Sequence, residues 1–132
     1  MYKHQTTVRL RDTDAAGVVY FASQLALAHE AFESYLDSVG IGIGVALRST
    51  HYAMPVVRVD ANYKKPLRAG DVIEVELSVE QTGNTSFTLH YRILDKEEDE
   101  AGSATITHVV IDRQHSTPRP LPDPLLSALK QI

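Results

Sequence analysis

The fold is decided by the stretch ASQLALAHEAFESYLDSV, residues 22–39. Apolar side chains recur in it at steps of three and four residues, which predicts an amphipathic helix with one apolar stripe. Gly40 follows, and glycine commonly ends a helix because it adopts the left-handed conformation without steric cost. A helix from about Ala22 to Val39 must therefore cover an apolar surface with one face. The stripe consists of Leu25, Ala28, Phe32, Tyr35, Leu36 and Val39.

The rest of the chain largely alternates apolar and polar residues, which is the pattern of strands with one buried face. The clearest strand covers residues 72–80, and Gly83-Asn84 suits a tight turn into a second strand over residues 87–93. Other strands are expected over residues 57–63 and 103–111, the latter toward the middle of the sheet, and a short one over residues 6–11. One long helix followed by four strands in hairpin succession predicts an α+β fold, with an antiparallel sheet of about five strands wrapped around the helix.

Length and composition indicate one globular domain over residues 1–132, with 43% hydrophobic residues and a formal net charge of −4. Four of the six prolines fall in residues 118–132, so this tail is expected on or near the surface, with a last helical turn around residues 125–130. The absence of cysteine excludes disulfides, thiolate metal sites and a cysteine nucleophile. The acidic balance argues against nucleic-acid binding. Without an apolar leader or an eighteen-residue apolar run, we expect a cytoplasmic protein that does not insert into membranes.

The densest motif is RDTDAAGVVYF, residues 11–21, between the first strand and the helix. Aspartates before a helix often serve only as turn and cap residues, and this interpretation stays open. A calcium loop fits at Asp12, Asp14 and Gly17, but it fails at position 5, which is Ala16, and at position 12, where Ser23 stands instead of glutamate. A carboxylate, a flexible glycine and a helix N-terminus together suit acyl transfer. The carboxylate attacks a carbonyl or activates water, and the helix amides hold the oxyanion.

Three further motifs carry weaker signals. HEAFE, residues 29–33, lacks the second histidine of a zinc-protease helix, so His29 and Glu33 are expected to form a hydrogen-bonded pair or to border a catalytic pocket. The glycines of residues 40–44 follow a helix, which favours a mobile connector over a phosphate loop. A Gly-x-Ser-x-Gly elbow is missing, which argues against a serine hydrolase of that type. A basic cluster is either a solvated strand end or a phosphate-binding patch, and consists of Lys64, Lys65 and Arg68.

The segments DTDAAGVVYF (12–21) and HEAFESYL (29–36) resemble the hotdog-fold acyl-CoA thioesterases of the 4-hydroxybenzoyl-CoA thioesterase type. The resemblance covers nearly the whole chain and includes AMPVV (53–57) and PLRAGD (66–71). Within the family, Tyr20-Phe21 and residues 29–36 are most similar to the branch that acts on 1,4-dihydroxy-2-naphthoyl-CoA in phylloquinone biosynthesis. Many short-chain relatives have a histidine where this chain has Phe21.

This resemblance implies a hotdog fold and the hydrolysis of an aromatic acyl-CoA, with 1,4-dihydroxy-2-naphthoyl-CoA as the expected substrate. No cofactor or metal is expected, because CoA is part of the substrate. The site of such enzymes lies between subunits, so a homodimer or homotetramer is implied. A short-chain or general acyl-CoA thioesterase and a noncatalytic acyl-CoA-binding module are the alternatives.

The resemblance also assigns roles to residues. Asp14 is implied to be the catalytic carboxylate, as nucleophile or as general base. The backbone around Gly17, Tyr20 and Phe21 is implied to hold the oxyanion. The remaining candidates are Val18, Val19, His29 and Glu33 for the acyl pocket and Lys64, Lys65 and Arg68 for the CoA phosphates.

Overall fold

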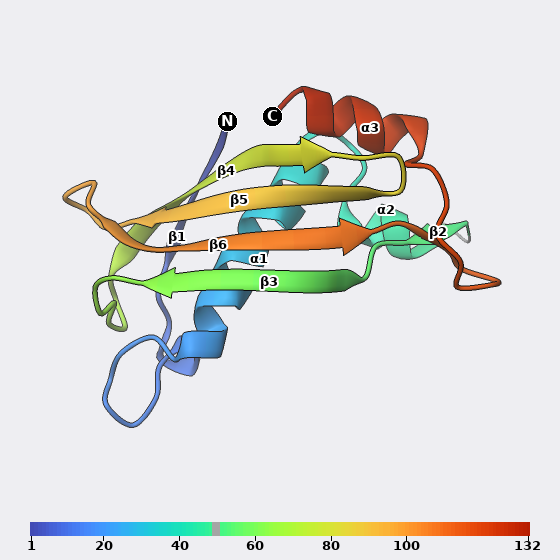
Figure 1. Cartoon of the computed structure of the whole chain (residues 1–132). Coiled ribbons are helices and arrows are strands. Elements are labelled where there is room, and N and C mark those ends of the chain that lie inside the picture. Colours follow the sequence, from blue (N-terminus) through green and yellow to red (C-terminus); the bar gives the residue numbers. More distant parts are fainter. Residues whose placement is uncertain (49–50) are drawn as a thin grey trace.

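The computed structural model describes residues 1–48 and 51–132, and in it a five-stranded antiparallel sheet curves around helix α1 (Phe21–Ser38) (Figure 1). This confirms the α+β class and the hotdog arrangement. The helix bounds agree with the prediction to within one residue at each end. Across the sheet the strands follow the order β1 (Tyr2–Thr7), β4 (Val72–Thr82), β5 (Ser86–Leu94), β6 (Glu100–Val109) and β3 (Val56–Tyr63).

The predicted hairpin succession is wrong between β3 and β4. β3 pairs with β6 at one edge of the sheet. The chain then crosses toward the opposite edge before β4 begins, and β4 pairs there with β1 and not with β3. β5 is therefore the central strand and β6 lies second from the edge. The end of β6 is apolar on both faces for another reason than a central place in the sheet. The C-terminal segment covers this end, and the Arg119 N–H donates to the carbonyl of Val110 at 3.0 Å.

The first strand lies earlier than predicted. β1 ends at Thr7, and residues 10–12 form a 3-10 turn, η1 (Leu10–Asp12), because the Asp12 carboxylate accepts a hydrogen bond from the Arg9 N–H at 2.8 Å. The glycine connector is partly helical: α2 (Ile43–Arg48) starts within it. A Cβ at Gly42 would meet the side chain of Asp37, which would have to move to make room for it. The two short strands β2 (Tyr52–Ala53) and β7 (Ile111–Asp112) were also not predicted.

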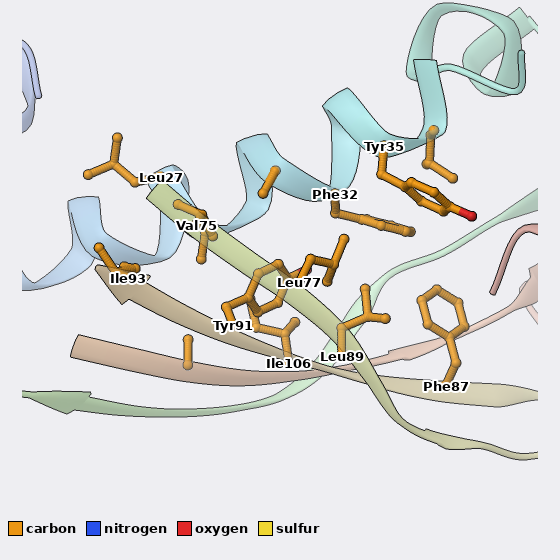
Figure 2. Close-up of a cluster of buried hydrophobic side chains, with 14 of the residues drawn as sticks. Leu27, Phe32, Tyr35, Val75, Leu77, Phe87, Leu89, Tyr91, Ile93 and Ile106 are labelled. Carbon is orange, nitrogen blue, oxygen red and sulfur yellow. The ribbon is translucent and has the colours of Figure 1, made fainter. Parts of the chain in front are cut away.

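The core lies between α1 and the inner face of the sheet (Figure 2). The middle of the predicted stripe is buried, whereas Leu25 is half-buried and Val39 is exposed at the helix end. The C-terminal tail contributes more than a surface covering, which corrects the prediction. Its helix α3 (Asp123–Lys130) buries Leu125 and Leu129, and the hydroxyl of Tyr35 donates to a carbonyl of this helix. The main sheet residues of the core are Val75, Leu77, Phe87, Leu89, Tyr91, Ile93 and Ile106.

Candidate active site

The loop between η1 and α1 holds Asp14 in a tight turn. The Asp14 N–H donates to the Val18 carbonyl, and the Asp14 carbonyl accepts from the Gly17 N–H, both at 3.0 Å. Gly17 has a φ of 79°, which favours glycine. One carboxylate oxygen, Oδ1, accepts the Ala16 N–H at 2.8 Å, and Oδ2 has no protein partner among the described residues. The exposed Asp14 carboxylate is thus oriented by its own turn and keeps one oxygen free for chemistry.

Helix α1 begins directly after this loop without a side-chain cap. The Tyr20 carbonyl accepts from the N–H groups of Ser23 (2.8 Å) and Gln24 (3.4 Å). Within residues 1–48 and 51–132, no group accepts a hydrogen bond from the N–H of Phe21 or Ala22. Free amides at a helix N-terminus carry partial positive charge and suit a developing oxyanion. The site therefore has a carboxylate and two open amide donors on one short segment.

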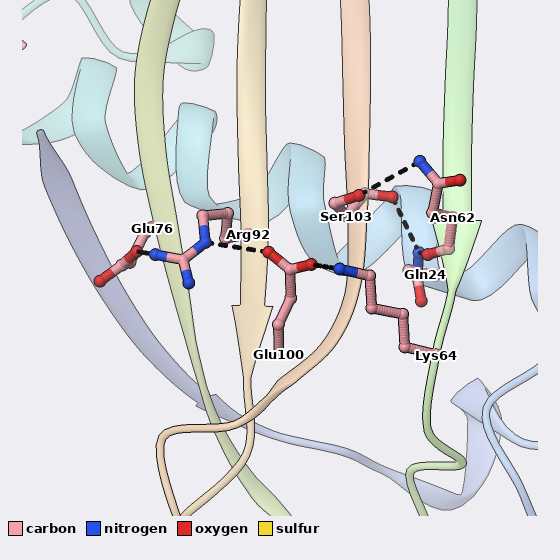
Figure 3. A network of polar contacts seen from close by, with 7 residues as sticks. All are labelled: Gln24, Asn62, Lys64, Glu76, Arg92, Glu100 and Ser103. Atoms are coloured by element: carbon pink, nitrogen blue, oxygen red, sulfur yellow. Dashed lines mark hydrogen bonds and ion pairs between the residues drawn. The ribbon is translucent and has the colours of Figure 1, made fainter.

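The start of α1 is fixed to the sheet by two side chains that the sequence reading missed. Gln24 is buried, and its Nε2 donates to the carbonyls of Asn62 (3.0 Å) and Ser103 (3.2 Å), which lie on β3 and β6 (Figure 3). The hydroxyl of Tyr63 donates to the carbonyl of Phe21 at 2.9 Å. A signal existed for Gln24, because it lies one turn before Ala28 and so on the buried side of the helix.

The loop is joined to the segment that follows β3. The Val19 N–H donates to the Leu67 carbonyl at 2.7 Å, and Val18 forms an isolated β-bridge with Arg68. A hollow of about 220 Å³ lies at this junction. Of the predicted pocket residues, Val19 lines it and Val18 lies next to it. The lining is formed by Val19, Gln24, Tyr63, Lys64, Lys65, Pro66 and Leu67.

The positive charge of Lys64 is neutralised by an ion pair within the chain. Its ammonium group pairs with Glu100, which also accepts a hydrogen bond from Arg92 at 2.9 Å, and Arg92 pairs with Glu76 at 2.7 Å (Figure 3). These four residues form a row of alternating charge across the outer face of the sheet. Hydrogen bonds from Lys64 and Arg92 lower the pKa of Glu100 below its usual value.

Lys65 is likewise paired, and Arg68 is not. The Lys65 ammonium lies 2.6 Å from Asp95 and 3.2 Å from Asp99, and its hydrogen bond lowers the pKa of Asp95. The Arg68 guanidinium has no carboxylate partner among the residues that the structure describes. The predicted basic cluster is therefore divided: of its three members, Arg68 is the one without a carboxylate partner in the described part of the chain.

His29 and Glu33 form the predicted hydrogen-bonded pair, with Nδ1 and Oε1 3.1 Å apart. His29 lies more than two helical turns beyond Phe21, about 12 Å along α1, and Glu33 lies about 18 Å along it. His29 lines a second hollow, of about 190 Å³, beneath α2 and β2. Figure 1 shows this end of the sheet opposite the Asp14 loop. The expected pocket combining Val18 and Val19 with His29 and Glu33 therefore does not form within one chain, because the helix separates its two halves.

His108, on β6, also lines the second hollow and is 2% exposed. Its ring stacks on Phe87, with centroids 4.9 Å apart, and its Nδ1 lies 3.0 Å from the carbonyl of Met54. A carbonyl only accepts, so Nδ1 carries the proton. The other ring nitrogen, Nε2, is buried and has no hydrogen-bond partner among the described residues. Burial and the neighbouring His29 lower the pKa of His108, against the hydrogen bond to Met54, so the ring is neutral and Nε2 is an acceptor.

The histidine, aspartate and glutamate side chains of residues 1–48 and 51–132 do not gather into a group of three or more that could hold a metal ion. None of the helices in these residues is both long enough and apolar enough to cross a membrane.

Comparisons with known proteins agree with the fold. The family model of the thioesterase-like superfamily matches residues 8–129. The chain is 39% identical over 127 residues to a 1,4-dihydroxy-2-naphthoyl-CoA hydrolase of Acaryochloris marina, covering 95% of this chain and 93% of the relative. A hydrolase of the same name from Rippkaea orientalis is 36% identical over 132 residues, covering 98% and 96%.

A solved structure gives the same result. The crystal structure of a 1,4-dihydroxy-2-naphthoyl-CoA thioesterase from Synechocystis superposes with a TM-score of 0.93 at 31% identity, and the match covers 99% of this chain and 96% of that one. The fold, the matched length and the relatives above 30% identity lead to one conclusion: the chain belongs to the thioesterase-like superfamily.

Proposed function

We propose that this protein hydrolyses 1,4-dihydroxy-2-naphthoyl-CoA to the free acid and CoA. The observation that carries the proposal is the Asp14 turn, which holds a carboxylate with one oxygen unpaired among the described residues on the same short segment as the open amides of Phe21 and Ala22. The names of the relatives at 39% and 36% identity support the choice of acyl group.

The chemistry follows from these groups. The helix amides, with Phe21 foremost, stabilise the negative charge that develops on the thioester oxygen. Asp14 either attacks the carbonyl carbon to form a mixed anhydride that water then hydrolyses, or takes a proton from the water that attacks. In both routes the carbon–sulfur bond breaks, CoA leaves as a thiolate that acquires a proton, and one oxygen of water ends in the acid.

We further propose that the active form is a homodimer, or a homotetramer built from it, paired along β3. This strand lies at the edge of the sheet and exposes Val56, Val57, Val59 and Tyr63 by 41–59%. An exposed apolar edge strand is a template for pairing with another chain. Antiparallel pairing with a second copy covers these side chains about a two-fold axis.

Such pairing brings the two separated halves of the site together. The Tyr63 end of β3 holds the start of α1 through the Phe21 carbonyl, and the Val56 end adjoins Met54 and the second hollow. In an antiparallel pair, each end lies against the opposite end of the partner strand. The Asp14 loop of one subunit then serves the hollow of the other, with His29 and Glu33 on the border of that acyl pocket.

For the CoA phosphates we propose Arg68 as the main contact. It is linked to the Asp14 loop through the bridge to Val18, and its charge is not shared with a carboxylate among the described residues. Lys64 and Lys65 line the hollow of about 220 Å³ beside the loop, and their charges are already paired, so their contribution is smaller.

A thiol-release assay tests the function. We expect Asp14→Asn to lower kcat for 1,4-dihydroxy-2-naphthoyl-CoA by at least about 10³-fold while the protein stays folded. Asp123→Asn, an exposed carboxylate on α3, is the matched control and keeps wild-type activity. Near-wild-type turnover by Asp14→Asn would sink the assignment.

A panel of aliphatic and aromatic CoA esters tests the acyl group. We expect kcat/KM to be highest for the dihydroxynaphthoyl ester. A preference for short aliphatic esters would instead identify a general acyl-CoA thioesterase. Tight binding of the esters without release of thiol would identify a noncatalytic binding module.

A further inference from the structure

One residue that lines the second hollow, His108, carries an acceptor that is unpaired in the described part of the chain. The Nε2 atom of His108 is buried and has no donor within residues 1–48 and 51–132, whereas the Nδ1–H of the same ring donates to the carbonyl of Met54. Buried polar groups are rarely left unpaired, because water is lost without replacement. Aromatic rings surround this histidine: Phe87 stacks on it and Phe32 lies 5.6 Å away, centroid to centroid. The missing donor must therefore come from outside the described residues.

The hollow itself is suited to a flat, mostly apolar guest. Its walls include Phe32, Ala46, Leu47 and Met54. The other histidine in the wall is His29. Its Nδ1 is paired with Glu33 and its side chain is 32% exposed, so it has less need of a hydrogen-bond donor from a ligand than His108 has. An apolar acyl group would fill this space and leave Nε2 unpaired. A ring that carries a hydroxyl would fill the space and supply the donor.

We propose that His108 is a specificity-determining residue whose Nε2 accepts a hydrogen bond from a ring hydroxyl of the acyl group, so that the pocket selects hydroxyaryl CoA esters. This inference rests on the proposed function, because it takes the hollow as the acyl pocket. In the 1,4-dihydroxy-2-naphthoyl group the 1-hydroxyl is ortho to the thioester and can bond to its carbonyl. The 4-hydroxyl points away from the thioester and is the one assigned to His108.

The test compares two esters that differ only at this position, 1,4-dihydroxy-2-naphthoyl-CoA and 1-hydroxy-2-naphthoyl-CoA. We expect wild-type kcat/KM to favour the dihydroxy ester at least tenfold, since a site built to bond a hydroxyl rejects the analogue without one. His108→Phe keeps the stacking on Phe87 and removes the acceptor, so the two esters become equal within about twofold. Met54→Leu is the control: it alters the pocket wall, keeps the carbonyl that binds Nδ1, and retains the preference.

The same ratio is measured as equilibrium binding to Asp14→Asn, which holds the esters uncleaved. This separates the two proposals. If wild type cleaves neither ester but Asp14→Asn still binds the dihydroxy ester at least tenfold more tightly, the proposed function fails and the role of His108 stands. If wild type shows equal kcat/KM and Asp14→Asn equal affinity for the two esters, or if a folded His108→Phe keeps the preference, the role of His108 is overturned and the proposed function is unaffected.

Discussion

At the scale of single residues, Arg68 differs from Lys64 and Lys65 because its charge is not neutralised by a carboxylate among the described residues. Arg68→Ala is expected to raise KM for the CoA ester several-fold at low ionic strength, with a smaller effect at high salt, because exposed charges are screened. Steady-state kinetics at two salt concentrations measure this. Lys130→Ala, an exposed cation in the last turn of α3, is the control and leaves KM unchanged. An unaltered KM in Arg68→Ala would mean that the CoA phosphates bind elsewhere.

Residues of the candidate site were predictable only where they lie on one continuous segment. Asp14, Gly17 and Phe21 fall within eight positions, so a loop motif before a helix shows them together. Gln24 and His108 act through contacts with distant strands: the partners of Gln24 are 38 and 79 positions away, and that of His108 is 54 positions away. Periodicity shows that such residues face inward and does not show what they meet.

At the scale of elements, the position of α1 depends on a glycine in β6. A Cβ at Gly102 would collide with the amide of Gln24, which anchors the helix start to β3 and β6. Gly102→Ala is therefore expected to lower stability by about 1–3 kcal/mol through lost hydrogen bonds and to lower kcat with little change in KM, because the oxyanion amides shift. Thermal unfolding and kinetics measure the two effects.

The double variant Gln24→Ala/Gly102→Ala is the control for this collision. It removes the side chain that the new Cβ meets, so its stability should be no lower than that of Gln24→Ala alone. Strictly additive losses would show that Gly102 acts by another route, such as the local strand conformation.

Elements with strong periodicity were predicted well, and pairings between them were not. The alternation over residues 72–80 and 87–93 and the turn at Gly83 identified the β4–β5 hairpin correctly, because the hairpin is a local structure. Alternation gives no partner for β3, whose neighbour β6 is distant in the chain. The sequence pattern did not predict α2, because glycines, which disfavour helices, occupy two of the positions around its start.

At the scale of the whole molecule, the separation between the Asp14 loop and the His108 hollow predicts that each site is shared by two subunits. Asp14→Asn removes the carboxylate, and Ala46→Trp fills the hollow, so each variant alone should be inactive. In a mixed dimer one site carries both lesions and the other carries neither. A one-to-one mixture after subunit exchange should therefore recover about a quarter of wild-type activity, since half of the dimers are mixed and each has one intact site.

The opposite outcome is equally clear. If both halves of the site came from one chain, every site in the mixture would carry one lesion and no activity would return. Purifying the mixed species with two different affinity tags removes the statistical factor, and its activity should then reach about half that of wild type. A charged substitution on the β3 edge, Val57→Lys, provides the link to assembly: it should dissociate the pair in size-exclusion chromatography and abolish activity, because a lysine then replaces an exposed apolar side chain that the pairing would cover.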